Sequence, residues 1–242
     1  EGLKKLAALD PASLPAVSGD PRLGCPVGAI GKIICVGLNY SDHAAETGMQ
    51  VPAEPIIFMK ATTSINGPND TVIIPKNSKK TDWEVELGIV IGKKAQYVEE
   101  KDSLDHVAGY VLVNDISERE FQIERHGQWV KGKSADTFAP IGPWLVTKDE
   151  IADPQQLKMW LDVNGKRCQD GSTTTMVYGV KHLVSYISQF MTLMPGDIIP
   201  TGTPPGVGAG MKPPMFLKPG DVMKLGIEGL GEQQQDVVGY KG

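Results

Sequence analysis

The sequence predicts a mainly β protein of the α+β class with a few short helices. Short apolar, β-branched runs recur along the 242 residues, and most of them are bounded by Gly, Pro, Asn or Asp. The composition agrees, because 28 Gly and 18 Pro with only 6% aromatic residues are typical of many turns that join short strands. A chain of this length can bury one large core, so we expect one main domain rather than two.

Residues 1–31 are rich in Leu, Ala and Pro, and they predict a lead-in segment wrapped on the surface ahead of a single domain over residues 32–242. The apolar run GKIICVGLNY predicts a strand that feeds a short helix, because Ser41 and Asp42 supply capping side chains before helix-forming residues. Helices are expected over residues 117–124 and 180–191. Further strands are expected at residues 56–59, 71–74, 83–91, 110–114, 144–147, 158–163, 198–199 and 222–227.

The charge pattern excludes several classes of partner. The net charge is −5 and the lysines and arginines are scattered among acids, so we expect no nucleic-acid partner. No window approaches the roughly 18 apolar residues of a membrane-spanning helix, so we expect no membrane segment. The 3 cysteines lack CxxC spacing, which argues against a disulfide framework or a zinc site and favours a cytoplasmic location.

Two carboxylates stand at the start of the apolar strand in DWEVELGIVIG (residues 82–92). Because side chains alternate along a strand, Glu84 and Glu86 share one face, with their Cα atoms about 6.6 Å apart. Such a pair repels unless a cation neutralises it. The alternative is that both glutamates line the exposed face of an edge strand and pair with Lys79 or Lys80.

Asp115 closes the next apolar run, residues 110–114, and offers a third oxygen ligand if the two strands are neighbours. Three carboxylates without cysteine or clustered histidine form a hard, oxygen-only donor set. That chemistry suits Mg²⁺ or Mn²⁺, with coordination positions left for water and substrate.

His43 and Glu46 lie three residues apart on the expected helix after residue 40, and therefore on one face. A carboxylate in that position can orient an imidazole and raise its basicity, so that it activates water. The alternative for His43 is a structural histidine near a helix start.

Three later stretches add polar groups. Arg119 and Gln122 follow Asp115 by four and seven residues, on one face of a helix leaving the metal site. Residues 131–136 (KGKSAD) offer amines and hydroxyls on a loop, and residues 201–208 (TGTPPGVG) offer hydroxyls and backbone amides that can hold a carboxylate. The alternatives are plain connecting loops and, for Arg119, a surface ion pair with a neighbouring glutamate.

The chain from about residue 33 onward resembles the fumarylacetoacetate hydrolase family. The resemblance rests on the order and spacing of six segments, VGLNYSDHAAE, PIIFMK, DWEVELGIVIG, GYVLVNDISEREFQ, KGKSADTFAPIGPW and IIPTGTPPGVG. It implies a β-roll or sandwich of mixed strands with a few short helices, usually in a homodimer.

The resemblance also implies roles for single residues. It makes Glu84, Glu86 and Asp115 the ligands of Mg²⁺ or a similar divalent ion. It makes His43 and Glu46 a dyad, on a mobile lid, that orients and deprotonates water, and it places Lys133 beside the metal. It implies that Arg119, Gln122 and Thr203 bind the substrate, Thr203 at its carboxylate end.

The activity implied by the resemblance is hydrolysis of a C–C bond in a 2,4-dioxo acid, either an acylpyruvate or a 2,4-diketo-3-deoxy sugar acid, to give pyruvate or a related product. Ureidoglycolate lyase stays open, as do decarboxylases, isomerases and hydratases of 2-oxo acids, since all act on the same kind of chelated acid. A non-catalytic, metal-binding β scaffold is the alternative of another class. A glycosidase is disfavoured, because two carboxylates on one strand face cannot flank a scissile bond.

Overall fold

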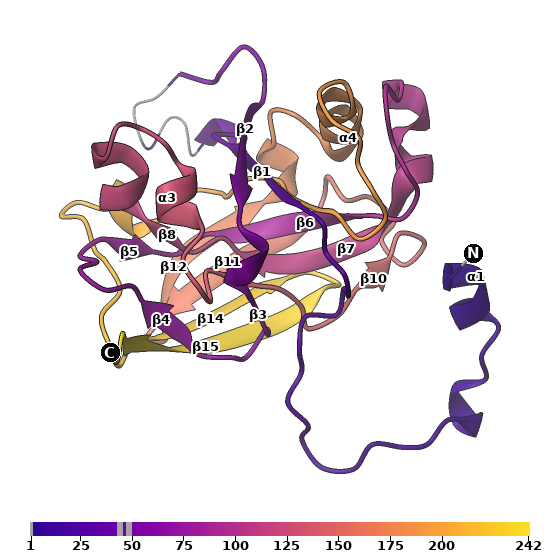
Figure 1. Cartoon of the computed structure of the whole chain (residues 1–242), viewed down its shortest axis with the longest axis horizontal. Helices are drawn as coiled ribbons and strands as arrows, with labels where there is room; N and C mark the ends of the chain where they lie inside the picture. The colour runs from indigo at the N-terminus through magenta and orange to yellow at the C-terminus, as the bar shows by residue number, and fades with distance from the viewer. Residues whose placement is uncertain (1, 43–45, 47–49) are drawn as a thin grey trace.

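The computed structural model describes residues 2–42, 46 and 50–242, and it contains two main β-sheets (Figure 1). The first sheet has six strands in the order β10-β7-β6-β13-β1-β2. These are β1 (Ile33–Gly37), β2 (Ile56–Lys60), β6 (Val85–Ile91), β7 (Val107–Asn114), β10 (Val146–Thr147) and β13 (Ile198–Pro200). β1 runs parallel to β13, and the other neighbours in this sheet are antiparallel.

The second sheet has five strands in the order β12-β11-β14-β15-β4. These are β4 (Val72–Ile74), β11 (Lys158–Val163), β12 (Lys166–Ser172), β14 (Val222–Ile227) and β15 (Gly231–Gly239). Two short pairs accompany the sheets, β3 (Ile65–Asn66) with β9 (Ala139–Pro140) and β5 (Thr81–Asp82) with β8 (Ser117–Glu118). The predicted fold class, mainly β with mixed strands and a few short helices, is confirmed.

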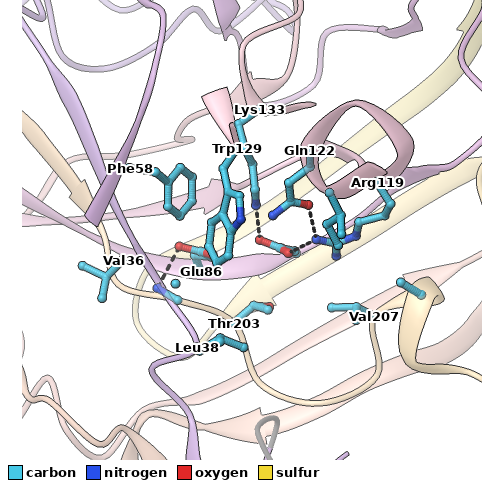
Figure 2. A pocket seen from close by; sticks show the side chains of 15 residues that line it. Val36, Leu38, Phe58, Glu86, Arg119, Gln122, Trp129, Lys133, Thr203 and Val207 are labelled. Atoms are coloured by element: carbon cyan, nitrogen blue, oxygen red, sulfur yellow. Dashed lines mark hydrogen bonds and ion pairs between the residues drawn. The ribbon is translucent and has the colours of Figure 1, made fainter. Parts of the chain in front are cut away.

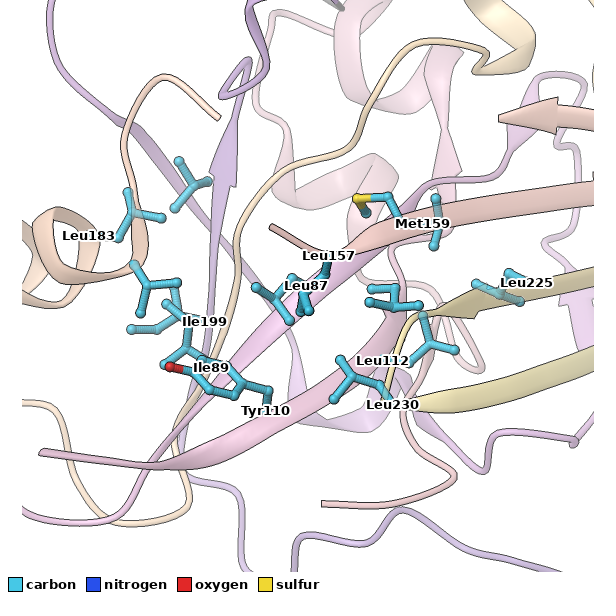
Figure 3. Packing of buried hydrophobic residues seen from close by; sticks show 14 of the residues in the cluster. Leu87, Ile89, Tyr110, Leu112, Leu157, Met159, Leu183, Ile199, Leu225 and Leu230 are labelled. Atoms are coloured by element: carbon cyan, nitrogen blue, oxygen red, sulfur yellow. The ribbon is translucent and has the colours of Figure 1, made fainter. Parts of the chain in front are cut away.

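The main hydrophobic core lies between the two sheets (Figure 3). Leu87 of β6 and Leu112 of β7 pack in one cluster with Met159 of β11 and Leu225 of β14, and all four side chains are fully buried. Because side chains alternate along a strand, Val111 points to the opposite face of the first sheet, where it belongs to a second buried cluster. The first sheet is therefore covered on both faces, which explains why β6 and β7 are buried along their whole length.

The N-terminal segment contacts this body only at its end. Residues 2–22, which include α1 (Gly2–Ala7), are exposed throughout, and Figure 1 shows α1 extending away from the sheets. Cys25, Val27 and Ile30 pack against the second buried cluster, on the outer face of the first sheet. Wrapping on the surface is therefore confined to the last part of the segment.

The helices are short. α4 (Val180–Ser188) buries Leu183, Val184 and Ile187 on one face, as their spacing predicted, but it ends before residue 191. α3 (Val130–Lys133) forms where a loop was predicted. Single-turn or 3₁₀ segments lie at Pro11–Ser13, Thr62–Ser64, Glu100–His106, Thr173–Thr175 and Gly208–Gly210. None of the helices in the described part of the chain is long and apolar enough to cross a bilayer.

The helix predicted over residues 117–124 is wrong in its first part. The chain first forms β8, which pairs with β5, and only then turns into a π-helix at Glu120–Glu124. The buried carboxylate of Glu118 explains the difference, because it accepts a hydrogen bond from the backbone N–H of Lys80 at 3.0 Å. Tertiary bonds of this kind override the local helical preference.

Candidate active site

Three carboxylates meet where β6 begins and β7 ends. The two strands are antiparallel with Val85 opposite Asn114, which brings Glu84 and Glu86 beside Asp115. One oxygen of each carboxylate lies within 4.8 Å of the others. The three residues are 6%, 1% and 0% exposed, and β6 lies inside the sheet between β7 and β13. The alternative of an exposed edge strand is therefore wrong.

Two lysines and one arginine, all buried, contact this cluster. Lys133 Nζ lies 2.7 Å from Glu84 Oε2 and 2.7 Å from Asp115 Oδ2. Arg119 Nη1 lies 2.8 Å from Glu84 Oε1. Lys60 Nζ lies 2.5 Å from Asp115 Oδ1. The structure thus brings Lys133 and Arg119 to the carboxylates and adds a second lysine.

Lys60 is a site residue that the sequence reasoning missed. Its side chain is fully buried at the end of β2, and Nζ also donates to the backbone carbonyl of Ile116 at 3.1 Å. A signal was present in PIIFMK, because a lysine that closes an apolar strand needs a partner of opposite charge if its side chain is buried. The identity of that partner, Asp115, depends on tertiary structure.

Glu86 has the least compensated charge of the three carboxylates. Among the described residues, the ion pairs of the cluster go to Glu84 and Asp115, whereas Glu86 Oε2 accepts a hydrogen bond from Gly202 N at 2.9 Å. Burial, followed by the negative charges of Asp115 and Glu84, raises the pKa of Glu86 well above its ordinary value. A cation placed between the three carboxylates would remove this repulsion.

The donor set fits a hard divalent ion. Only carboxylate oxygens converge in the cluster formed by Glu84, Glu86 and Asp115. Mg²⁺ and Mn²⁺ prefer oxygen ligands, whereas zinc and copper sites use imidazole or thiolate. These three residues can therefore hold Mg²⁺ or Mn²⁺, in agreement with the predicted chemistry.

Glu84 and Glu86 of the cluster line a pocket with a cavity volume of about 110 Å³ (Figure 2). The polar part is lined by Glu84, Glu86, Arg119, Gln122 and Lys133. The remaining lining is mostly apolar and comes from Val36, Gly37, Leu38, Phe58, Ile123, Trp129, Gly202, Thr203, Val207 and Ala209. The charged and apolar parts adjoin, since Lys133 Nζ lies 5.0 Å from the centroid of the Phe58 ring.

Asp82 connects the carboxylate cluster to the loop over residues 201–210. Its buried carboxylate accepts hydrogen bonds from Gly208 N at 2.7 Å and Ala209 N at 3.0 Å. It also accepts one from Arg119 Nε at 2.8 Å, while the same guanidinium reaches Glu84. The alternative of a surface ion pair for Arg119 is therefore wrong. This role of Asp82 was also missed, although the residue stands in the DWEVELGIVIG segment.

Both cations of the polar wall stay charged. Burial alone lowers the pKa of Lys133, but the negative charges of Asp115 and Glu84 raise it by more, so the net shift is upward. For Arg119, burial likewise lowers the pKa, but the negative charges of Asp82 and Glu84 raise it by more, so the net shift is again upward. The two side chains therefore act as fixed positive charges and not as proton donors.

Gln122 and Thr203 line the pocket but already make internal hydrogen bonds. Gln122 Oε1 accepts from Arg119 Nη1 at 3.1 Å, which directs the amide nitrogen of Gln122 away from the arginine. Thr203 Oγ1 donates to Val85 O at 2.9 Å and accepts from Gln169 Nε2 at 2.8 Å. The hydroxyl proton of Thr203 is thus used within the protein.

The predicted dyad is described only in part, because His43 lies outside the described residues. Glu46 is exposed, and its carboxylate accepts from Gly206 N at 3.1 and 3.2 Å. Gly206 has a φ of +104°, and a Cβ there would lie 1.9 Å from the carbonyl oxygen of Cys168, so only glycine fits. One loop therefore contacts Glu46 through Gly206 and Asp82 through the residues that follow.

The mainly β fold with its carboxylate cluster in a pocket is shared with enzymes of known structure. The chain belongs to the fumarylacetoacetate hydrolase family, since the family model described as fumarylacetoacetate (FAA) hydrolase C-terminal matches residues 32–238. It is therefore an enzyme of that family, as the resemblance of its segments predicted.

Individual relatives agree with this assignment. A Burkholderia cenocepacia protein named provisionally as a hydrolase is 64% identical over 235 residues, which are 97% of this chain and 83% of the relative. The structure of fumarylacetoacetate hydrolase from Exiguobacterium antarcticum has a TM-score of 0.88 at 39% identity, over 96% of this chain and 83% of that one. The structure of 5-carboxymethyl-2-hydroxymuconate delta-isomerase from Mycobacterium smegmatis has a TM-score of 0.80 at 38% identity, over 91% and 83%.

Proposed function

We propose that this protein hydrolyses a C–C bond of a 2,4-dioxo acid, an acylpyruvate or a 2,4-diketo-3-deoxy sugar acid, with the help of Mg²⁺ or Mn²⁺ held by Glu84, Glu86 and Asp115. The observation that carries the proposal is the buried three-carboxylate cluster at the pocket. Lys133 and Arg119 line the same pocket, and their positive charges suit an anionic substrate. We propose further that the protein acts as a cytoplasmic homodimer, as its family resemblance implies.

Glu84, Glu86 and Asp115 would hold the divalent ion, which would supply a Lewis acid for the acid end of the substrate. The remaining steps fall to side chains of the protein. Lys133 places its ammonium beside Glu84 and Asp115, where it balances negative charge that develops on the substrate oxygens. Gln122 accepts from Arg119 through Oε1, so its amide nitrogen is the end available to donate to substrate.

His43, oriented by Glu46, takes a proton from water, and the resulting hydroxide adds to the 4-carbonyl carbon. The C3–C4 bond then breaks, which releases a carboxylic acid and the enolate of pyruvate, and the enolate gains a proton at C3. Glu46 accepts a hydrogen bond from Gly206 N, and neighbours of Gly206 in the loop of residues 201–210 line the pocket, which supports a place for the dyad beside the pocket. Thr203, on the same loop, is proposed to position the carboxylate end of the substrate.

A 2-oxo-acid isomerase is the second candidate. Its support is specific, because a structure named 2-hydroxyhepta-2,4-diene-1,7-dioate isomerase, from Mycobacterium marinum, has a TM-score of 0.79 at 38% identity. Isomerisation would use the same acid-binding end but no attacking water, so it does not require a base that activates water.

The experiment that separates these candidates measures two signals from one reaction. Loss of the enol-diketone absorbance of a panel of 2,4-dioxo acids reports conversion, and lactate dehydrogenase with NADH reports release of pyruvate. Hydrolysis gives both signals, each abolished by EDTA and by His43→Ala. Conversion of a 2-hydroxy-dienedioate without pyruvate would identify an isomerase. Tight binding of Mn²⁺ without turnover of these acids, ureidoglycolate or oxaloacetate would identify a scaffold.

A further inference from the structure

Lys60 and Lys133 contact the same carboxylate through its two oxygens. Lys60 Nζ lies 2.5 Å from Asp115 Oδ1, and Lys133 Nζ lies 2.7 Å from Asp115 Oδ2. The segments that carry the two lysines are joined directly after them, because Ala61 N donates a hydrogen bond to Ser134 Oγ at 2.9 Å. Each oxygen of Asp115 therefore has its own ammonium partner.

Lys133 is the partner on the side of the pocket. It lines the pocket, and its second ion pair goes to Glu84 Oε2 at 2.7 Å. A divalent ion held by Glu84 and Asp115 would compete with this ammonium for the same two carboxylates. The Phe58 ring, whose centroid lies 5.0 Å from Lys133 Nζ, offers the ammonium another favourable contact.

Lys60 is held away from the pocket. Its side chain is fully buried, and it is not among the described residues that line the pocket. Besides Asp115, Lys60 Nζ donates to the backbone carbonyl of Ile116 at 3.1 Å, and the nearby Phe138 ring has its centroid 6.0 Å away. Neither of these groups belongs to the carboxylate cluster or to the pocket lining. The contact of Lys60 with Asp115 therefore does not depend on what occupies the pocket.

We propose that Lys60 is a positioning residue, which holds Asp115 Oδ1 so that Oδ2 faces Glu84 and stays available to the divalent ion. The torsion that turns an aspartate carboxylate is soft, so the side chain alone does not fix which oxygen faces the cluster. The ion pair with Lys60 fixes it, and the bridge of Lys133 from Oδ2 to Glu84 shows the resulting orientation. The inference rests on the metal site of the proposed function and gives Lys60 no contact with substrate.

Two effects of opposite sign make the role of Lys60 testable. Loss of a positive charge beside a metal ligand favours binding of a cation. Loss of the partner that orients a ligand carboxylate weakens metal binding, by roughly 10–100-fold. Lys60→Met should therefore raise the dissociation constant of Mn²⁺ by roughly tenfold or more. The matched contrast is Lys133→Met, which removes the same charge from the other oxygen of Asp115 and should keep the constant or lower it.

Titration with Mn²⁺, followed by the electron paramagnetic resonance signal of the free ion, measures these constants, and circular dichroism checks that both variants fold. An unchanged or lower dissociation constant in Lys60→Met would overturn the inference, because Lys60 would then act through its charge alone. Absence of Mn²⁺ binding in the unmodified protein would instead overturn the metal site on which the proposed function rests.

A measurement on the unmodified protein does not depend on the folding of Lys60→Met. Proton–nitrogen NMR observes lysine ammonium groups that are buried and exchange slowly with water, and the signal that disappears in Lys60→Arg is that of Lys60. Addition of Mg²⁺ should leave this signal protected from exchange, because the ion pair with Asp115 Oδ1 is kept. Loss of the protection on addition of Mg²⁺ would overturn the inference.

Turnover separates positioning from a direct catalytic role. Lys60→Met should raise the Mn²⁺ concentration that gives half-maximal turnover by the same factor as the dissociation constant. Lys133→Met should instead lower kcat at saturating Mn²⁺, because Lys133 lines the pocket. A fall of kcat at saturating Mn²⁺ in Lys60→Met as large as that in Lys133→Met would contradict a role of Lys60 through Asp115 alone.

Discussion

Arg119 donates through Nε to Asp82 Oδ2 at 2.8 Å, and this buried ion pair connects the pocket to the loop over residues 201–210. Asp82 holds the loop through Gly208 N and Ala209 N. Arg119 holds Glu84 with its other edge. A change at Asp82 should therefore reach the carboxylate cluster although Asp82 does not line the pocket.

Asp82→Asn is expected to lower the free energy of unfolding by roughly 3 kcal/mol, because it removes one of the two carboxylates that pair with the buried guanidinium of Arg119. Urea denaturation followed by fluorescence measures this loss. The control is Asp162→Asn, which removes the partner of the half-exposed Arg167 and should cost less than about 1 kcal/mol. Equal losses of unfolding free energy in the two variants would show that the buried Asp82–Arg119 pair stabilises the fold no more than an exposed ion pair does.

The ammonium of Lys133 should matter for turnover more than for metal binding. Lys133→Met removes a positive charge beside Glu84 and Asp115, so affinity for Mn²⁺ should be kept or increase. The rate kcat should fall by roughly 10²–10³, the usual effect of removing one group that stabilises developing negative charge. Stopped-flow turnover and titration with Mn²⁺ measure the two quantities. Lys80→Met, which removes a cation paired with the exposed Glu124, is the control. Parallel loss of turnover and Mn²⁺ binding would instead assign Lys133 a structural role.

The fold was predictable where the strands have apolar inner faces. β11 and β14 have the bounds that were predicted from their apolar, β-prone runs. β15 was missed because its buried positions include Gln233 and Gln235, so the hydrophobic period is absent. Both glutamines are paired internally, as in the 2.9 Å bond from Gln233 Nε2 to the carbonyl of Leu112. A strand that buries hydrogen-bonded amides cannot be recognised by apolar spacing.

The candidate site was predictable to the extent that its residues begin or end apolar strands. Glu84, Glu86 and Asp115 all do so, and the structure brings them together. Asp82 and Lys60 were missed because their partners lie 37 and 55 residues away in the chain. Local sequence carries the charge of such residues but not the identity of the group that balances it.

Removal of the metal should make stability depend on pH through Glu86. Its pKa in the folded, metal-free protein is raised by burial and by its neighbours, so the folded state binds this proton more tightly than the unfolded state does. The metal-free protein should therefore lose stability as pH rises from the unfolded pKa of Glu, about 4.3, through the raised folded value. Above that range the carboxylate is ionised in both states and the loss is complete.

Mg²⁺ should reverse this loss, because it competes with the proton at Glu86, and its stabilising effect should grow with pH. Thermal melts with EDTA and with Mg²⁺ across pH 5 to 8 test the expectation. Glu86→Gln is the control, since a neutral amide has no proton to lose and the pH dependence of the EDTA melt should flatten. An Mg²⁺ effect that is constant with pH would mean that Glu86 does not titrate in competition with the ion.

Gly206→Ala should disturb the loop that carries Thr203 and contacts Glu46. The substitution places a Cβ 1.9 Å from the carbonyl oxygen of Cys168, at a φ of +104°, so the loop must move away from β12. Gly165→Ala is the matched control, because Gly165 has a φ of +74° but nothing within 4 Å of its Cβ position. Gly165→Ala should cost only the roughly 1–2 kcal/mol of a left-handed alanine, with turnover unchanged, whereas Gly206→Ala should cost more and also lower kcat. Chemical denaturation and turnover measure both effects. Equal losses of stability with full activity would show that the contact of the loop with Glu46 has no part in catalysis.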